Sequence, residues 1–257
     1  MSFADTAPIL IAFACALLAL SWLSRQISIR TQRVTYFITL SLDFATLAIF
    51  LLFLPGIIAH ESAHWLMARL VGLKVSKFRV WPKRQGDHIG LGSVNVDRGD
   101  AWRESLVGVA PLLLGTLLLA LIGAQVFQAE RFVTVLDSGQ VTGIVGVFFQ
   151  ALGSADGLIW AYLVFTIGNS MMPSQSDREP LKTVLLYLAF FAIVYFVVGL
   201  PGDFFGALLA WATPLFAIIV GALIFVLLLD LIVLAFLYPL ELLLERRGAL
   251  QRHDPRK

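Results

Sequence analysis

The sequence predicts an all-α polytopic membrane protein with about six transmembrane helices and one small β-hairpin, built as a single membrane-embedded domain over residues 1–257. Hydrophobic residues make up 59% of the chain and charged residues 14%, whereas soluble domains carry about 45–50% and 25%. Mean hydropathy is +0.86, and the charged residues gather between long apolar stretches. A net charge of +2 gives no indication of a nucleic-acid partner. The single cysteine, Cys15, excludes a disulfide within the chain.

The first apolar stretch, residues 7–23, predicts a membrane helix near the N-terminus. A cleaved signal peptide carries basic residues ahead of its apolar core. Here Asp5 precedes the stretch and no basic residue does, so we expect a retained helix. Arg25, Arg30 and Arg33 follow in a predicted polar link, which completes the N-terminal part of the domain, residues 1–35.

The next apolar stretch, residues 36–71, is too long for one upright span of about 20 residues. Pro55-Gly56 interrupts it, and a proline inside a helix removes a hydrogen bond and bends the helix. We therefore favour one tilted and kinked helix over residues 40–71. The alternative is two passes that turn at Pro55-Gly56, which leaves residues 57–71 short for a span.

Residues 72–100 predict a β-hairpin. Residues 73–81 and 88–96 are rich in β-forming residues that partly alternate, and residues 82–87 between them have the composition of a turn. A hairpin between membrane helices presents an edge to which an extended peptide can pair. An ordinary surface hairpin is the alternative interpretation.

The remaining apolar stretches complete the predicted set of spans: residues 105–124, 157–172, 181–199 and 204–240. Residues 125–156 are predicted to form a loop that is too short for an independent domain. The C-terminal part of the domain, residues 181–257, holds two spans and ends in a polar, basic tail that starts at Glu241.

The distribution of basic residues predicts the orientation in the membrane. Eight basic residues lie between Arg69 and Arg103 and five in the tail, but the loop 125–156 has only Arg131. The positive-inside rule then places the hairpin and the tail in the cytoplasm of a plasma-membrane protein. The side of Arg25, Arg30 and Arg33 stays open, because a single kinked second helix puts them outside and two passes put them inside.

The most informative motif is His60-Glu61-x-x-His64. Two histidines four residues apart lie on one face of a helix, with about 5–6 Å between their Cβ atoms, and can bind one Zn²⁺. The glutamate between them can take a proton from a water on the metal. The competing interpretation is a pair of core histidines with ordinary partners, but such a polar cluster is costly in hydrocarbon and needs a functional reason.

A catalytic zinc ion needs a third protein ligand. The candidates are His88, Asp177, Glu179, Asp43 and Asp230. Asp177 is favoured because it closes the fourth predicted span at a polar end interrupted by proline, on the same predicted side as the hairpin end of the His60–His64 helix. We interpret Asp43 and Asp230 as buried carboxyls that are neutral or hydrogen-bonded to neighbouring helices.

Residues 60–69, followed by 71–78, resemble the zinc-binding helix and following strand of the site-2 proteases, which are intramembrane metalloproteases. The second motif of that family is N-x-x-P-x-x-x-x-D-G, and Asn169 and Asp177 stand here at the matching interval. Pro173 comes one place late and Arg178 replaces the glycine. The resemblance implies that Asp177 is the third zinc ligand, that Asn169 positions the substrate, and that residues 40–180 are the catalytic core. Many members carry a PDZ domain in the segment that corresponds to 125–156, which has no room for one here.

The sequence therefore predicts an intramembrane zinc endopeptidase with one Zn²⁺ per chain on His60, His64 and Asp177. Glu61 is the expected base, and Asn169 the expected contact to the substrate. The expected partners are the lipid bilayer and a single-pass membrane protein that is cut within or near its transmembrane helix. One alternative is a non-proteolytic zinc-containing membrane protein that acts as a binding or regulatory partner. Another is a different membrane metalloprotease with Glu179 as third ligand.

Overall fold

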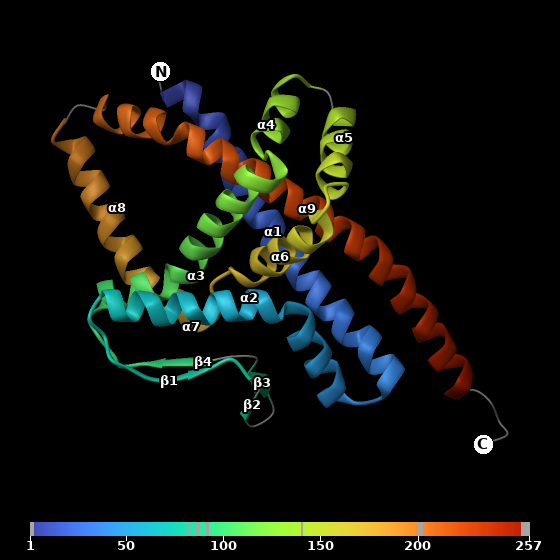
Figure 1. Ribbon diagram of the computed structural model, residues 1–257. Coiled ribbons are helices and arrows are strands. Elements are labelled where there is room, and N and C mark those ends of the chain that lie inside the picture. The colour runs from blue at the N-terminus through green and yellow to red at the C-terminus, as the bar shows by residue number, and fades with distance from the viewer. Residues whose placement is uncertain are drawn as a thin grey trace.

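The computed structural model describes residues 3–81, 83–85, 88–90, 93–139, 141–199 and 203–252 (Figure 1). The described elements, in chain order, are α1 (Phe3–Thr39), α2 (Leu42–Leu70), β1 (Val75–Arg79), β2 (Lys83–Gln85), β3 (His88–Gly90), β4 (Ser93–Val96), α3 (Ala101–Ile122), the π-helical turn η1 (Gly123–Phe127), α4 (Glu130–Asp137), α5 (Val141–Leu152), α6 (Gly157–Ser170), α7 (Gln175–Arg178), α8 (Leu181–Val197) and α9 (Asp203–Arg252).

The fold agrees with the prediction of a helical, multi-pass membrane protein, although six spans are not confirmed. Among the described residues, four helical segments are long and apolar enough to cross a membrane, and they lie in α1, α2, α3 with η1, and α9. Helices α5 and α6 add a fifth if they count as one span that is bent by 112°. Helix α8 has 17 residues, or about 25 Å of helix, against a hydrocarbon core of about 30 Å. It stands at the edge of the molecule (Figure 1).

Helix α1 continues through the segment that was predicted to be a polar link, so that prediction is wrong. The helix continues because its basic residues have a buried partner on α9. The Arg30 and Arg33 side chains each pair with Glu241, with N–O distances of 2.5 and 2.9 Å. The predicted polar, basic tail from Glu241 is helical as far as Arg252, where α9 ends. These pairs bring the C-terminal end of α1 beside the C-terminal part of α9, so Arg30, Arg33 and Glu241 share one side of the molecule.

Helix α2 is a single helix with Pro55 inside it, as favoured from the sequence, and it changes direction along its length (Figure 1). Because Pro55 has no N–H, the carbonyl of Leu51 loses its helical partner. The Tyr162 hydroxyl of α6 lies at this gap, 3.0 Å from the carbonyl oxygen of Leu52 and 3.5 Å from that of Leu51. At the next residue, Gly56, an added Cβ would collide with the Thr166 carbonyl, so glycine allows the backbones of α2 and α6 to touch.

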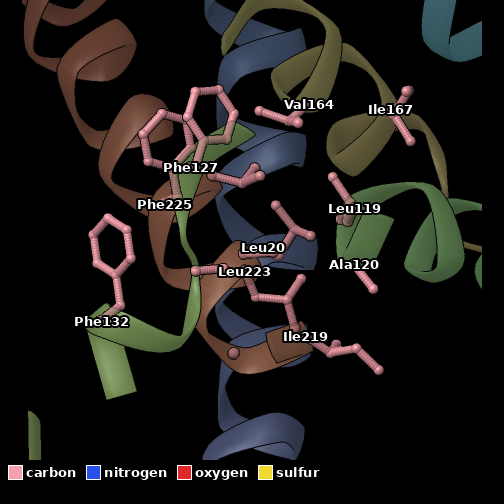
Figure 2. Close-up of a cluster of buried hydrophobic side chains, with 14 of the residues drawn as sticks. Leu20, Leu119, Ala120, Phe127, Phe132, Val164, Ile167, Ile219, Leu223 and Phe225 are labelled. Carbon is pink, nitrogen blue, oxygen red and sulfur yellow. The ribbon is translucent and has the colours of Figure 1, made fainter. Parts of the chain in front are cut away.

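The predicted loop 125–156 is also a helical region, in correction of the sequence analysis. Its η1, α4 and α5 carry buried aromatic rings that pack on α9, and the Phe127 and Phe225 rings stack with centroids 4.1 Å apart. Figure 2 shows these rings in one cluster with side chains from α1, α3 and α6, among them Leu20, Leu119 and Val164. Burial against α9, which is distant in sequence, holds this segment in helices.

The predicted hairpin is present, with one difference. Strands β1 and β4 pair antiparallel, as predicted, and Phe78 faces Val94. Residues 83–85, predicted as turn, instead form β2 and pair with β3; residues 82, 86 and 87 lie outside the described part of the chain. The hairpin folds back along α2, since the Trp81 ring lies 5.3 Å from the ring of Phe50.

Candidate metal centre

The structure brings His60 and His64 of α2 together with Asp177 of α7. The two Nε2 atoms are 3.2 Å apart, His64 Nε2 lies 3.5 Å from Asp177 Oδ1, and His60 Nε2 lies 3.8 Å from Asp177 Oδ2. Tetrahedral zinc with bonds of about 2.0–2.2 Å holds its ligand atoms roughly 3.3–3.6 Å from one another. Among the described residues, this is the one group of three or more His, Cys, Asp or Glu side chains that can hold a metal ion.

The orientation of both imidazoles is fixed by backbone carbonyls. His60 Nδ1 lies 2.6 Å from the carbonyl oxygen of Ser170, and His64 Nδ1 lies 2.9 Å from that of Val107. A carbonyl oxygen only accepts hydrogen bonds, so each Nδ1 carries the hydrogen and each neutral ring presents a lone pair at Nε2. Metal-bound histidines make this kind of contact through the other ring nitrogen. Two lone pairs and a carboxylate therefore converge on one point, and a cation there removes their mutual repulsion.

Both accepting carbonyls are available for a structural reason. Ser170 is the last residue of α6, and the final carbonyls of a helix have no partner within it. Val107 lies inside α3, but the residue four places on is Pro111, which has no N–H to offer. The proline is thus a sequence signal for the acceptor of His64, and the sequence analysis missed it.

The carboxylate of Asp177 is held by a capping box at the start of α7. The Ser174 N–H donates to Asp177 Oδ2 at 2.8 Å, and the Asp177 N–H donates to Ser174 Oγ at 3.3 Å. Asp177 therefore sits in a short helix of its own after α6, where the sequence analysis had it closing the fourth span. Helix α3 lies directly behind it, because an added Cβ on Gly108 would collide with the Asp177 carbonyl.

Glu61 lies between two cavities. Its side chain is 9% exposed. It lines a cavity of about 350 Å³ together with His60 and Asn169. It also lines a larger cavity of about 1010 Å³ that contains all three residues of the candidate metal centre. Val94 and Val96 of β4 line the larger cavity as well, so the hairpin forms part of its wall.

The side chain of Asn169 faces the smaller cavity and is hydrogen-bonded within the protein. Its Nδ2 donates to the Phe165 carbonyl at 2.9 Å and to Asp230 Oδ1 at 2.7 Å. Both hydrogens of the amide are therefore used. Its Oδ1 is buried and has no hydrogen-bond partner among the described residues.

The other predicted ligand candidates lie elsewhere. Glu179 is exposed at the end of α7 and is outside the metal group. Asp43 is exposed in the first turn of α2, so its prediction as a buried carboxyl is wrong; a carboxylate is favourable there because it faces the positive end of the helix dipole. Asp230 is buried and hydrogen-bonded to a neighbouring helix, as predicted. His88 belongs to β3, and its side chain lies outside the described part of the structure.

No protein-family model, curated protein or solved structure matches this chain. The chain has helices suited to crossing a membrane and a two-histidine, one-carboxylate group that can hold a metal ion.

Proposed function

We propose that this protein is an intramembrane zinc endopeptidase that cuts membrane proteins within or near a transmembrane helix. The observation that carries the proposal is the convergence of two Nε2 lone pairs and one carboxylate at ligand spacing, with an acidic side chain between the histidines in sequence. The resemblance of residues 60–78 and 169–177 to the site-2 proteases points the same way.

In this proposal His60, His64 and Asp177 hold the metal. Two imidazoles and one carboxylate are a donor set that suits Zn²⁺, and three protein ligands leave a fourth position for water or substrate. When bound, zinc would polarise the scissile carbonyl and lower the pKa of a water towards about 7. The Ser170 and Val107 carbonyls and the Ser174 N–H keep the three ligands oriented.

Glu61 is the proposed general base. It takes the proton that the attacking water releases and gives it to the leaving amine. Its place on the walls of both cavities supports this role, because it has access to the metal group and to the space beside Asn169. Asn169 lines the smaller cavity, and its Oδ1, which is buried and without a partner among the described residues, would accept an N–H from the substrate backbone once it is uncovered.

The hairpin is proposed to hold the substrate as an added strand. Peptides bind sheet edges through main-chain hydrogen bonds, and β4 lines the same cavity as the metal group. The substrate is then a membrane protein with an unwound segment beside the hairpin. The proposed location is the plasma membrane, with the hairpin on the cytoplasmic side. If α2 crosses the membrane as one span, the C-terminal end of α9 lies on the opposite side, because its Glu241 pairs with Arg30 and Arg33, which precede α2.

The substitution Glu61→Gln tests the proposal. The amide keeps the size of the side chain but cannot accept the proton, so we expect full zinc content and cleavage that is lower by about 10²–10⁴-fold. The protein would be reconstituted in vesicles with a panel of tagged single-pass transmembrane segments, and products separated by gel and mass spectrometry. Glu130→Gln, at an exposed carboxylate at the start of α4 that lines neither cavity, is the matched control and should cleave as the wild type does.

Two outcomes would contradict the proposal. Cleavage by Glu61→Gln at the wild-type rate would exclude Glu61 as the base. A wild-type protein that binds zinc stoichiometrically but cuts no segment of the panel would favour the alternative, a non-proteolytic zinc protein that acts as a binding or regulatory partner.

A further inference from the structure

Asp230 is a buried carboxyl that the proposed reaction does not use. It lies in the apolar span Trp211–Arg246 of α9, and its side chain is 0% exposed. An ionisable side chain at such a place is costly and usually has a function. One oxygen accepts the hydrogen bond from Asn169, and the other has no partner among the described residues. An apolar residue would avoid this cost, so the contact with Asn169 needs an explanation.

The contact fixes the orientation of the Asn169 amide. The Phe165 carbonyl can only accept, so the amide nitrogen must face it, and the second hydrogen of that nitrogen then points to Asp230. Without Asp230 one donor of the amide would be buried without a partner, which is unfavourable.

A second hydrogen bond, from helix α1, also holds Asn169. Ser24 Oγ of α1 donates to the backbone carbonyl of Asn169 at 2.8 Å. Helix α1 thus contacts the main chain of Asn169, and helix α9 contacts its side chain. Ser170 is the next residue in the chain, and its carbonyl accepts the hydrogen bond from His60 Nδ1.

We propose that Asp230 is a positioning residue of the candidate metal centre. From α9 it fixes Asn169 and thereby the last turn of α6, whose Ser170 carbonyl sets the orientation of His60. Asp230 touches neither metal nor substrate, and Ser24 assists it from α1. This inference rests on the proposed metal binding, although not on proteolysis.

Metal affinity tests the inference without any substrate. Loss of a group that orients a ligand costs about 10–100-fold in metal affinity, and we expect about 10-fold for Asp230→Leu because it acts through Asn169. Asp230→Asn should restore near-wild-type affinity, since its carbonyl oxygen accepts the same hydrogen bond. Zn²⁺ affinity would be measured by competition with a chelator on purified protein in detergent, and Co²⁺ spectra would report ligand geometry.

Glu241 supplies the matched control, because it is another buried carboxyl on α9 and its ion-pair partners among the described residues, Arg30 and Arg33, lie on α1. Glu241→Leu should lower thermal stability and leave Zn²⁺ affinity and the Co²⁺ spectrum unchanged. A merely structural role of Asp230 predicts the same pattern for Asp230→Leu.

Unchanged Zn²⁺ affinity and Co²⁺ spectrum in Asp230→Leu would overturn the inference. If that variant does not fold, Ser24→Ala provides the test. It removes only the hydrogen bond from Ser24 to the Asn169 carbonyl and should weaken Zn²⁺ binding about threefold. Unchanged affinity in Ser24→Ala would then overturn the inference. A wild-type protein that binds neither Zn²⁺ nor Co²⁺ would instead overturn the proposed metal binding.

Discussion

Two buried acidic clusters join distant helices in this protein, and they differ in charge balance. Glu241, 5% exposed, meets the guanidinium groups of Arg30 and Arg33, so its negative charge is matched within the chain. Asp177 meets His60 and His64, whose Nδ1 hydrogens are taken by carbonyls and whose Nε2 lone pairs point inwards. The first cluster contains its own positive charges, and the second contains none while both imidazoles are neutral.

The difference separates a structural contact from a site that can bind a ligand. The arginine cluster consists of direct ion pairs and needs no further support. The histidine cluster has each member braced from outside, by Ser170, Val107 and Ser174. These hydrogen bonds hold two lone pairs and a carboxylate close together, although the three groups repel one another. A cation bound between them would offset this repulsion.

The largest expected effect is the loss of metal from the histidine cluster. Wild-type protein should carry about one zinc per chain, and the double substitution His60→Ala with His64→Ala should carry none, because one carboxylate is not a stoichiometric zinc site. Metal analysis of purified protein measures this. Full zinc content in the double variant would show that the histidine cluster is not the zinc site, and the contrast with the arginine cluster would then be wrong.

The arginine cluster should respond in stability alone. Glu241→Leu leaves Arg30 and Arg33 without their partner, and because these side chains are 23% and 63% exposed, we expect a loss of about 1–3 kcal/mol, below that of a fully buried pair. Thermal or denaturant unfolding in detergent would show the loss, while zinc content stays at the wild-type level. A fall in zinc content of the folded variant would mean that the two clusters are coupled.

Asp177→Asn sharpens the assignment of the third ligand. The amide keeps the capping interaction but has no negative charge. Loss of a group that merely orients a ligand lowers metal affinity by up to about 100-fold, and we expect a loss of about that size for this direct ligand. Chelator competition measures the change. Glu179→Gln is the control and should bind as the wild type does; if it is Glu179→Gln that loses affinity, the third ligand is Glu179.

The smallest expected effect comes from Pro111. In Pro111→Ala the new N–H of residue 111 competes with His64 for the Val107 carbonyl, so Zn²⁺ affinity should fall about threefold to tenfold. The helix itself should become more stable, because a helical hydrogen bond is restored. Tighter zinc binding in this variant would contradict the role of the freed carbonyl. Pro239→Ala on α9 is the matched control, with no expected change in affinity.

The sequence analysis predicted the local features well and the long-range contacts poorly. The i, i+4 histidines, the kinked α2 and the β1–β4 pair follow from patterns within a few residues. Arg30 and Arg33 were interpreted as a polar link because their partner Glu241 lies more than 200 positions away. Residues 125–156 were interpreted as a loop because their helices are completed by packing on Phe225. The position of Asp177 in a group with His60 and His64 was predicted by motif order, but the capping box and the freed carbonyls that orient the group were missed.

The ion pairs of Glu241 bear on how deep Asp230 and the candidate metal centre lie in the membrane. Eleven residues of α9 separate Asp230 from Glu241, which is about 16 Å along a helix axis. If the Arg30–Arg33–Glu241 cluster marks the edge of the hydrocarbon core, an upright α9 puts Asp230 about halfway through a core of about 30 Å, and a tilted α9 puts it nearer the edge. Asp230 contacts Asn169, whose neighbour Ser170 contacts His60. In the proposed protease the tilt of one helix would therefore set the level of the bilayer at which a substrate meets the candidate metal centre, and membrane thickness would influence where the substrate is cut.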